Sequence, residues 1–99
     1  MSSPTETAIE IVKDYGEYLD YCFTSLPYEY TLEQVSYSKW AVLEILRLLN
    51  HYPSIPPLLI MENFRSKLYE FSRINQRTNF IFSIACEIVD NAIDILVSL

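Results

Sequence analysis

The chain has 99 residues, of which 51% are hydrophobic and 20% are charged, and it contains a single glycine. This composition excludes a disordered or collagen-like chain, because such chains lack the apolar surface that offsets the entropy cost of ordering. The length predicts one domain over residues 1–99. Helix is the expected structure, since the tight turns of a small β-rich domain usually need glycine.

The formal charge of −6 repels nucleic-acid phosphates and anionic membrane surfaces. We therefore expect no direct nucleic-acid or membrane partner, and we expect a protein partner that is itself basic or nucleic-acid-binding. The first seven residues carry neither the basic nor the apolar region of a signal peptide. Cys22 and Cys86 lie on apolar faces of different predicted helices, which is typical of buried thiols in a reducing compartment. These features predict a cytoplasmic protein.

Four helices are predicted in chain order. The first spans residues 4–24, because Ser3, Pro4 and Glu6 form a helix start and apolar residues then recur every three or four positions. Inside it, Gly16 costs about 1 kcal/mol relative to alanine, so we expect either a close neighbour or a bend. The second helix spans 32–50 after the cap signal Thr31 and Gln34, and it is apolar around most of its circumference, which indicates a central helix.

A proline-rich break separates this helix from the third, predicted over residues 57–73 with apolar residues at alternating steps of four and three. The polar run Asn75 to Asn79 forms the last break, and the fourth helix is predicted over 79–98. Loops of a few residues make consecutive helices antiparallel neighbours. The sequence therefore predicts an all-α fold, a small antiparallel four-helix bundle.

Acids and tyrosines coincide in the first third of the chain. Glu6, Glu10 and Asp14 follow one another at i, i+4, a spacing that like charges disfavour. Three interpretations of this acidic face are open: it keeps the protein soluble, it binds a basic partner, or it binds a metal ion. The sequence lacks the Glu-x-x-His pairs with which di-metal helical bundles hold their ions. Six of the eight tyrosines fall between Tyr15 and Tyr37, where they serve either the edge of the core or partner recognition. The candidate partner-binding residues are Glu10, Asp14, Glu17, Asp20, Tyr21, Tyr28, Glu29 and Tyr30.

Positive charge gathers instead around the third break, at Arg65, Lys67, Arg73 and Arg77. Such a basic corner either pairs with acids within the bundle or across a dimer, or contacts phosphate, or stays solvated. We expect pairing with acids.

A catalytic site is not expected. The sequence has no Ser/His/Asp set, Cys/His pair, phosphate loop or dinucleotide motif, so we expect no cofactor. Helical HEPN ribonucleases cleave RNA with an arginine and a histidine separated by at least four residues. Arg47 and His51 resemble that pair, but only three residues separate them and a leucine follows the arginine. RNA cleavage is therefore a remote alternative.

In size, acidity and tyrosine content the chain resembles the four-helix colicin immunity proteins, which neutralise a basic nuclease, and small acidic inhibitors encoded by phages and mobile elements. The resemblance is one of architecture and assigns no family. The immunity proteins have a short third helix that bears tyrosines, whereas the predicted third helix of this chain begins with Pro-Pro and carries only Tyr69. It implies a protein-binding module that acts as an inhibitor, an antitoxin or immunity-like protein, or an adaptor. The alternative is a self-assembling structural protein, because a bundle this small leaves apolar surface uncovered. The two functions are compatible, since a dimer can still bind a partner, and we expect a homo-oligomer, specifically a homodimer.

Overall fold

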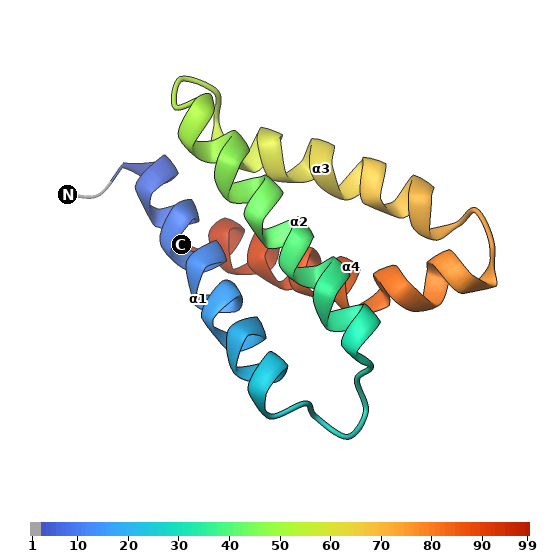
Figure 1. The fold of residues 1–99 in the computed structure, drawn as a ribbon. Helices are drawn as coiled ribbons and strands as arrows, with labels where there is room; N and C mark the ends of the chain where they lie inside the picture. The colour runs from blue at the N-terminus through green and yellow to red at the C-terminus, as the bar shows by residue number, and fades with distance from the viewer. Residues whose placement is uncertain (1–2) are drawn as a thin grey trace.

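The computed structural model describes residues 3–99 and folds into four helices (Figure 1). They are α1 (Pro4–Thr24), α2 (Leu32–His51), α3 (Pro57–Ser72) and α4 (Gln76–Ser98). No strand occurs within residues 3–99. The predicted all-α four-helix bundle is confirmed, and the predicted bounds of α1, α2 and α3 agree with the structure to within one residue at each end.

The start of α4 is a correction, since the helix begins at Gln76 and not at residue 79. Asn75 is its N-cap: the Asn75 side chain accepts a hydrogen bond from the backbone nitrogen of Thr78 at 2.9 Å. In return, the Thr78 hydroxyl accepts one from the backbone nitrogen of Asn75 at 3.0 Å. This reciprocal capping box satisfies amide donors that would otherwise lack a partner in the first turn, so the polar run belongs to the helix.

The four helices form two antiparallel hairpins, α1–α2 and α3–α4, which pack across each other (Figure 1). α2 packs most extensively on α1 and α4 and much less on α3. From a shared corner at the Tyr52–Pro56 connection, α3 runs away from α2, as Figure 1 shows. α2 is thus central, as predicted, but α3 does not cover it along its whole length.

The core lies where α2 meets α1 and α4, and it also takes in the inner face of α3. Its largest fully buried side chains are Leu19, Ile45, Leu49, Met61 and Leu68. Cys22 is fully buried, as expected, whereas Cys86 is only partly buried, and both are free thiols. Burial raises the pKa of the Cys86 thiol.

Gly16 marks a close approach of α1 to α2. The helix continues through this residue, and a β-carbon placed on it would lie 3.3 Å from Cγ1 of Val42. The Gly16 carbonyl also accepts a hydrogen bond from the ammonium of Lys39 at 3.3 Å. Of the two expectations for this glycine, the structure thus shows the close neighbour.

The longest helices of the bundle are amphipathic. Within residues 3–99, none of them combines the length and the apolar character needed to cross a membrane.

Candidate functional site

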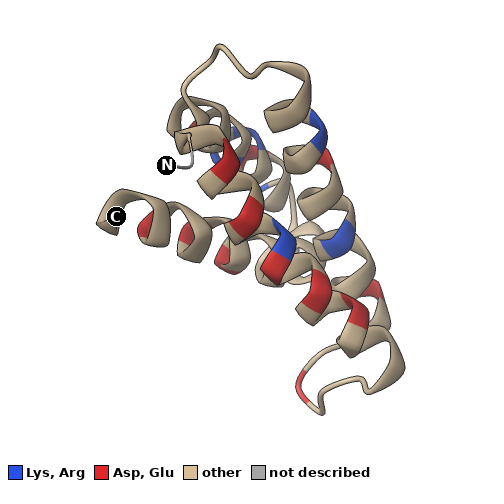
Figure 2. Ribbon diagram, turned by 90° about the vertical axis from the view of Figure 1, so that its left-hand side faces the viewer, with Lys and Arg blue, Asp and Glu red and all other residues tan. Residues whose placement is uncertain are grey.

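The predicted acidic residues of α1 lie at the molecular surface. Glu10, Asp14, Glu17 and Asp20 are all exposed. Figure 2 shows acidic residues along α1, with further acids on the neighbouring α4. Of these four, Asp20 has an ion pair, at 2.8 Å with Lys39 of α2. α1 and α4 therefore present a common acidic surface to solvent.

The predicted tyrosines divide into exposed and half-buried groups. Tyr21 is 61% exposed and Tyr28 is fully exposed, whereas Tyr30 is half-buried and packs against the core. Tyr30 also interacts with Tyr18, whose pKa is raised chiefly by side-chain hydrogen bonding to Tyr30 and Cys22. The structure thus places Tyr21 and Tyr28 free at the surface and ties Tyr30 to the bundle.

Backbone hydrogen bonds within the connection between α1 and α2 fix its conformation and keep Tyr21 and Tyr28 at the surface. The amide of Ser25 donates to the carbonyl of Tyr21 at 2.9 Å and closes α1. The amide of Tyr30 donates to the carbonyl of Pro27 at 3.0 Å, which forms a turn with Tyr28 and Glu29 at its tip. Both tip residues are exposed. We call the exposed set Asp20, Tyr21, Tyr28 and Glu29 the tyrosine–acid end.

The basic corner forms contacts mainly within the bundle. Arg77 pairs with Glu33 of α2 at 2.7 Å, and Arg65 lies 3.7 Å from Asp90 of α4. The guanidinium of Arg73 lies over the ring of Tyr69, 5.6 Å from its centroid. The expected pairing with acids is therefore confirmed for two of the four bases. Lys67 has no ion pair among the described residues.

Arg47 and His51 have separate neighbours in the structure. The guanidinium of Arg47 donates to the carboxylate of Glu44, with Nε 3.1 Å from Oε1, and this contact lowers the pKa of Glu44. The His51 ring packs edge-on against Tyr52, with 4.6 Å between ring centroids. Each side chain therefore has a structural contact of its own.

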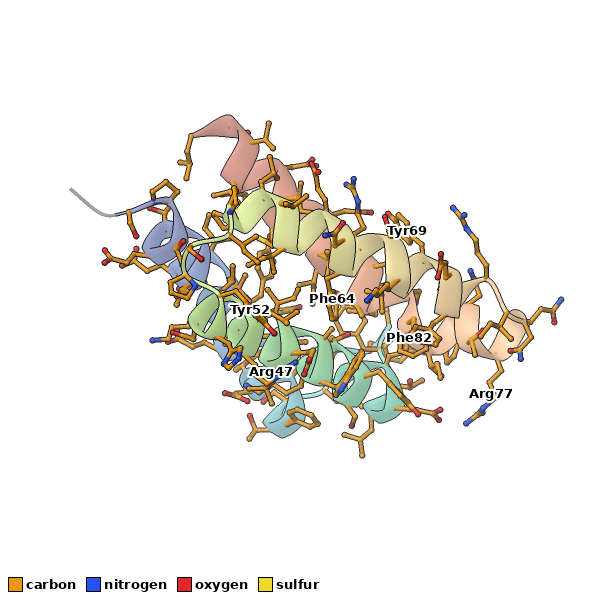
Figure 3. The ribbon with its side chains drawn as sticks, turned by 90° about the horizontal axis from the view of Figure 1, so that it is seen from above. Arg47, Tyr52, Phe64, Tyr69, Arg77 and Phe82 are labelled. Carbon is orange, nitrogen blue, oxygen red and sulfur yellow. The ribbon has the colours of Figure 1, made fainter. Side chains whose placement is uncertain are left out.

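An apolar groove between α2 and α3 is the feature that the sequence-based site did not include. It has a volume of about 490 Å³. Its lining includes Leu48, Phe64 and Leu68, and Figure 3 shows Phe64 of α3 beside Arg47 of α2 and Tyr52, the C-cap of α2. The rings of Trp40 and Phe64 lie 5.9 Å apart and link the two helices. The groove exists because α3 diverges from α2.

Beyond Trp40 and Phe71 the groove continues into a second apolar hollow, which these two side chains help to line. The hollow has a volume of about 380 Å³, and the rings of Tyr37 and Phe82 meet there edge to face at 5.1 Å. The two depressions together make one apolar surface along the α2–α3 face. We call this surface the α2–α3 groove.

One signal in the sequence pointed toward this groove. α2 carries apolar residues around most of its circumference, so three flanking helices are needed to cover it. The same pattern does not say which side stays open, because that depends on the angle at which the hairpins cross.

No three His, Cys, Asp or Glu side chains among residues 3–99 are grouped so that they could hold a metal ion. Comparison of the chain with protein-family models, curated proteins and solved structures finds no match.

Proposed function

We propose that this protein is a protein-binding module, an inhibitor, immunity-like protein or adaptor, which docks on a basic protein partner through its tyrosine–acid end. The observation that carries the proposal is the exposure of Tyr21 and Tyr28 beside Asp20 and Glu29.

An exposed tyrosine ring adds little to the stability of its own bundle, because it removes little apolar surface from water. The same ring contributes strongly to binding when a partner covers it, and tyrosine is among the residues that dominate interface energies. Tyr28 lies at the tip of a turn, where no other part of residues 3–99 covers its ring. Its position therefore suits an interface anchor.

The surrounding charge favours a basic partner. Glu29 at the turn and the exposed acids of α1 extend one negative surface from the tyrosine–acid end along the helix. Such a field accelerates encounter with a positively charged protein and weakens as salt screens it. Binding should therefore become slower and weaker at high ionic strength.

The test is recovery of a partner by the immobilised chain from a lysate of the cells that produce it. We expect a basic protein in stoichiometric amount, bound by the wild type and released by salt. The double variant Tyr21→Ala, Tyr28→Ala should lose it, since each hot-spot truncation costs about 2 kcal/mol or more.

A control is Val97→Ala, which removes an apolar side chain that is 62% exposed and belongs neither to the tyrosine–acid end nor to the α2–α3 groove. This variant should retain the partner, and far-ultraviolet circular dichroism should show native helix content for all the variants. Failure to recover any stoichiometric protein, or equal recovery by the double variant, would count against the proposal.

A further inference from the structure

Large apolar side chains remain uncovered along the α2–α3 groove. Trp40 is 47% exposed, Leu59 is 49% exposed and Phe71 is 52% exposed, although all three lie beside buried neighbours. Contiguous apolar surface of this kind on a small protein is a mark of an interaction site. Covering it would remove aromatic rings from water, which is the main source of interface stability.

Charge distinguishes this face from the acidic surface of α1 and α4. The groove is lined by two bases, Arg47 and Lys67, and by one acid, Glu44, in a chain that has 13 acids and seven bases. Arg47 is already paired with Glu44, whereas Lys67 has no ion pair within the described part of the chain. Two copies that approach through α1 and α4 bring acids against acids, while two copies that approach groove to groove do not.

We propose that the α2–α3 groove binds the same groove of a second copy of this chain, so that the protein is a two-fold symmetric homodimer. A two-fold axis along the groove places α2 of each copy over α3 of the other, because the rotation exchanges the two walls. Trp40 and Phe71 are then covered by apolar walls of the second copy. Lys67 faces α2 of the second copy, and Glu44 is the acid there that lines the groove.

The proposal is independent of docking through the tyrosine–acid end. None of the residues of that end lines the groove. A dimer formed through the groove therefore leaves both tyrosine–acid ends available, and the two proposals can fail separately.

Trp40 is the only tryptophan in the chain, so its fluorescence reports on the groove of the unmodified protein. The molar mass from light scattering should be that of a dimer at tens of micromolar. On dilution toward nanomolar concentrations, the mass should fall to that of a monomer and the Trp40 emission should shift to longer wavelength, because the indole becomes more exposed to water.

Charges placed on the groove walls should prevent the dimer. Leu59→Glu and Phe71→Glu change side chains that are about half exposed, so each variant should keep the helix content of the wild type while becoming monomeric at the same concentration. The matched control is Val97→Glu, which adds the same charge at an exposed apolar residue near the end of α4. This control should remain a dimer.

A charge exchange tests the two-fold arrangement itself. Lys67→Glu and Glu44→Lys should each weaken self-association, since each puts like charges across the interface. An equimolar mixture of these two single variants should form a heterodimer, because position 67 of each copy then faces the opposite charge at position 44 of the other.

A wild-type chain that is monomeric at tens of micromolar would overturn the proposal. In that case, a change of Trp40 emission on adding an amphipathic peptide or a fatty acid would assign the groove to another occupant. A dimer that persists in both Leu59→Glu and Phe71→Glu would also overturn it, by showing that another face is used. Loss of the dimer in Val97→Glu would likewise show that the copies associate through another face, and it would overturn the proposal.

Discussion

Tyr69 connects α3 to α4 through a hydrogen bond to a carboxylate. Its hydroxyl donates to Oδ2 of Asp90, and Arg65 lies 3.7 Å from the other oxygen of the same carboxylate. The hydrogen bond, assisted by burial, raises the pKa of Tyr69 to about 12. Because deprotonation removes the donor, the stabilisation belongs to the neutral tyrosine and depends on pH.

Replacing Tyr69 by phenylalanine should lower the free energy of unfolding by about 1–2 kcal/mol at neutral pH, since the bond has a charged acceptor but is partly solvated. The pKa of Tyr69 is higher in the folded than in the unfolded chain, so the contribution is complete below pH of about 10, the value for a free tyrosine. It should decline as the pH rises toward 12. Urea unfolding of the wild type and the Tyr69→Phe variant at pH 7 and across this range measures the difference.

Tyr21→Phe is the control for this experiment, because Tyr21 is 61% exposed. Its stability should equal that of the wild type at pH 7. Equal stabilities of the Tyr69→Phe variant and the wild type at pH 7 would contradict the assignment of the Tyr69 contact as stabilising.

At the scale of the helices, Gln34 both caps α2 and connects it to α4. Its Oε1 accepts a hydrogen bond from the amide of Thr31 at 2.9 Å. Its Nε2 donates to the carbonyl of Phe80 at 3.1 Å and to the hydroxyl of Ser83 at 3.2 Å. The residue is buried, so water cannot replace these partners when they are lost.

Gln34→Leu should therefore reduce the free energy of unfolding by about 2 kcal/mol, from the lost cap together with the lost contacts to α4. The comparison variant is Asn75→Ala, which removes the cap of α4 and should cost about 1 kcal/mol. Thermal and urea unfolding of both variants measure the difference. A loss in Gln34→Leu that is no larger than the loss in Asn75→Ala would show that the bridge to α4 adds nothing.

The helices themselves were largely predictable from the sequence, because caps and apolar periodicity are local. Thr31 and Gln34 predicted the start of α2, and Ser3 predicted that of α1. The contact of Gln34 with α4 was not predictable, since it joins residues 46 and 49 positions apart. The start of α4 was misplaced because Asn and Gln are common in loops, although Asn75 and Thr78 also fit a cap.

At the scale of the whole molecule, Tyr28 lies between the predicted helices 4–24 and 32–50, and the structure leaves it fully exposed. The α2–α3 groove did not follow from periodicity, because Trp40 and Phe71 belong to apolar stripes that predict burial. Each stripe indicates which face of a helix is apolar. Whether a neighbouring helix covers that face depends on the angle at which the α1–α2 and α3–α4 hairpins cross. That crossing depends on side-chain packing between distant segments.

A substitution in the acidic surface of α1 can separate the effect of its charge on docking from the effect of its charge on stability. Asp14 is exposed and follows Glu10 by one helical turn. Asp14→Lys turns a repulsive i, i+4 pair into an attractive one, so it should raise the free energy of unfolding by roughly 0.5 kcal/mol at low salt. The gain should disappear at high salt, because exposed charges are screened.

The same variant should bind the proposed basic partner more weakly, since it removes one negative charge and adds a positive one on the surface that attracts the partner. Stability and affinity should therefore change in opposite directions, as expected when charge is retained for binding at a cost to the fold. Asp14→Asn separates the loss of the acid from the gain of the base, and its effects should be intermediate. If Asp14→Lys gains stability while partner recovery stays unchanged, the acidic face at this position serves solubility and not docking.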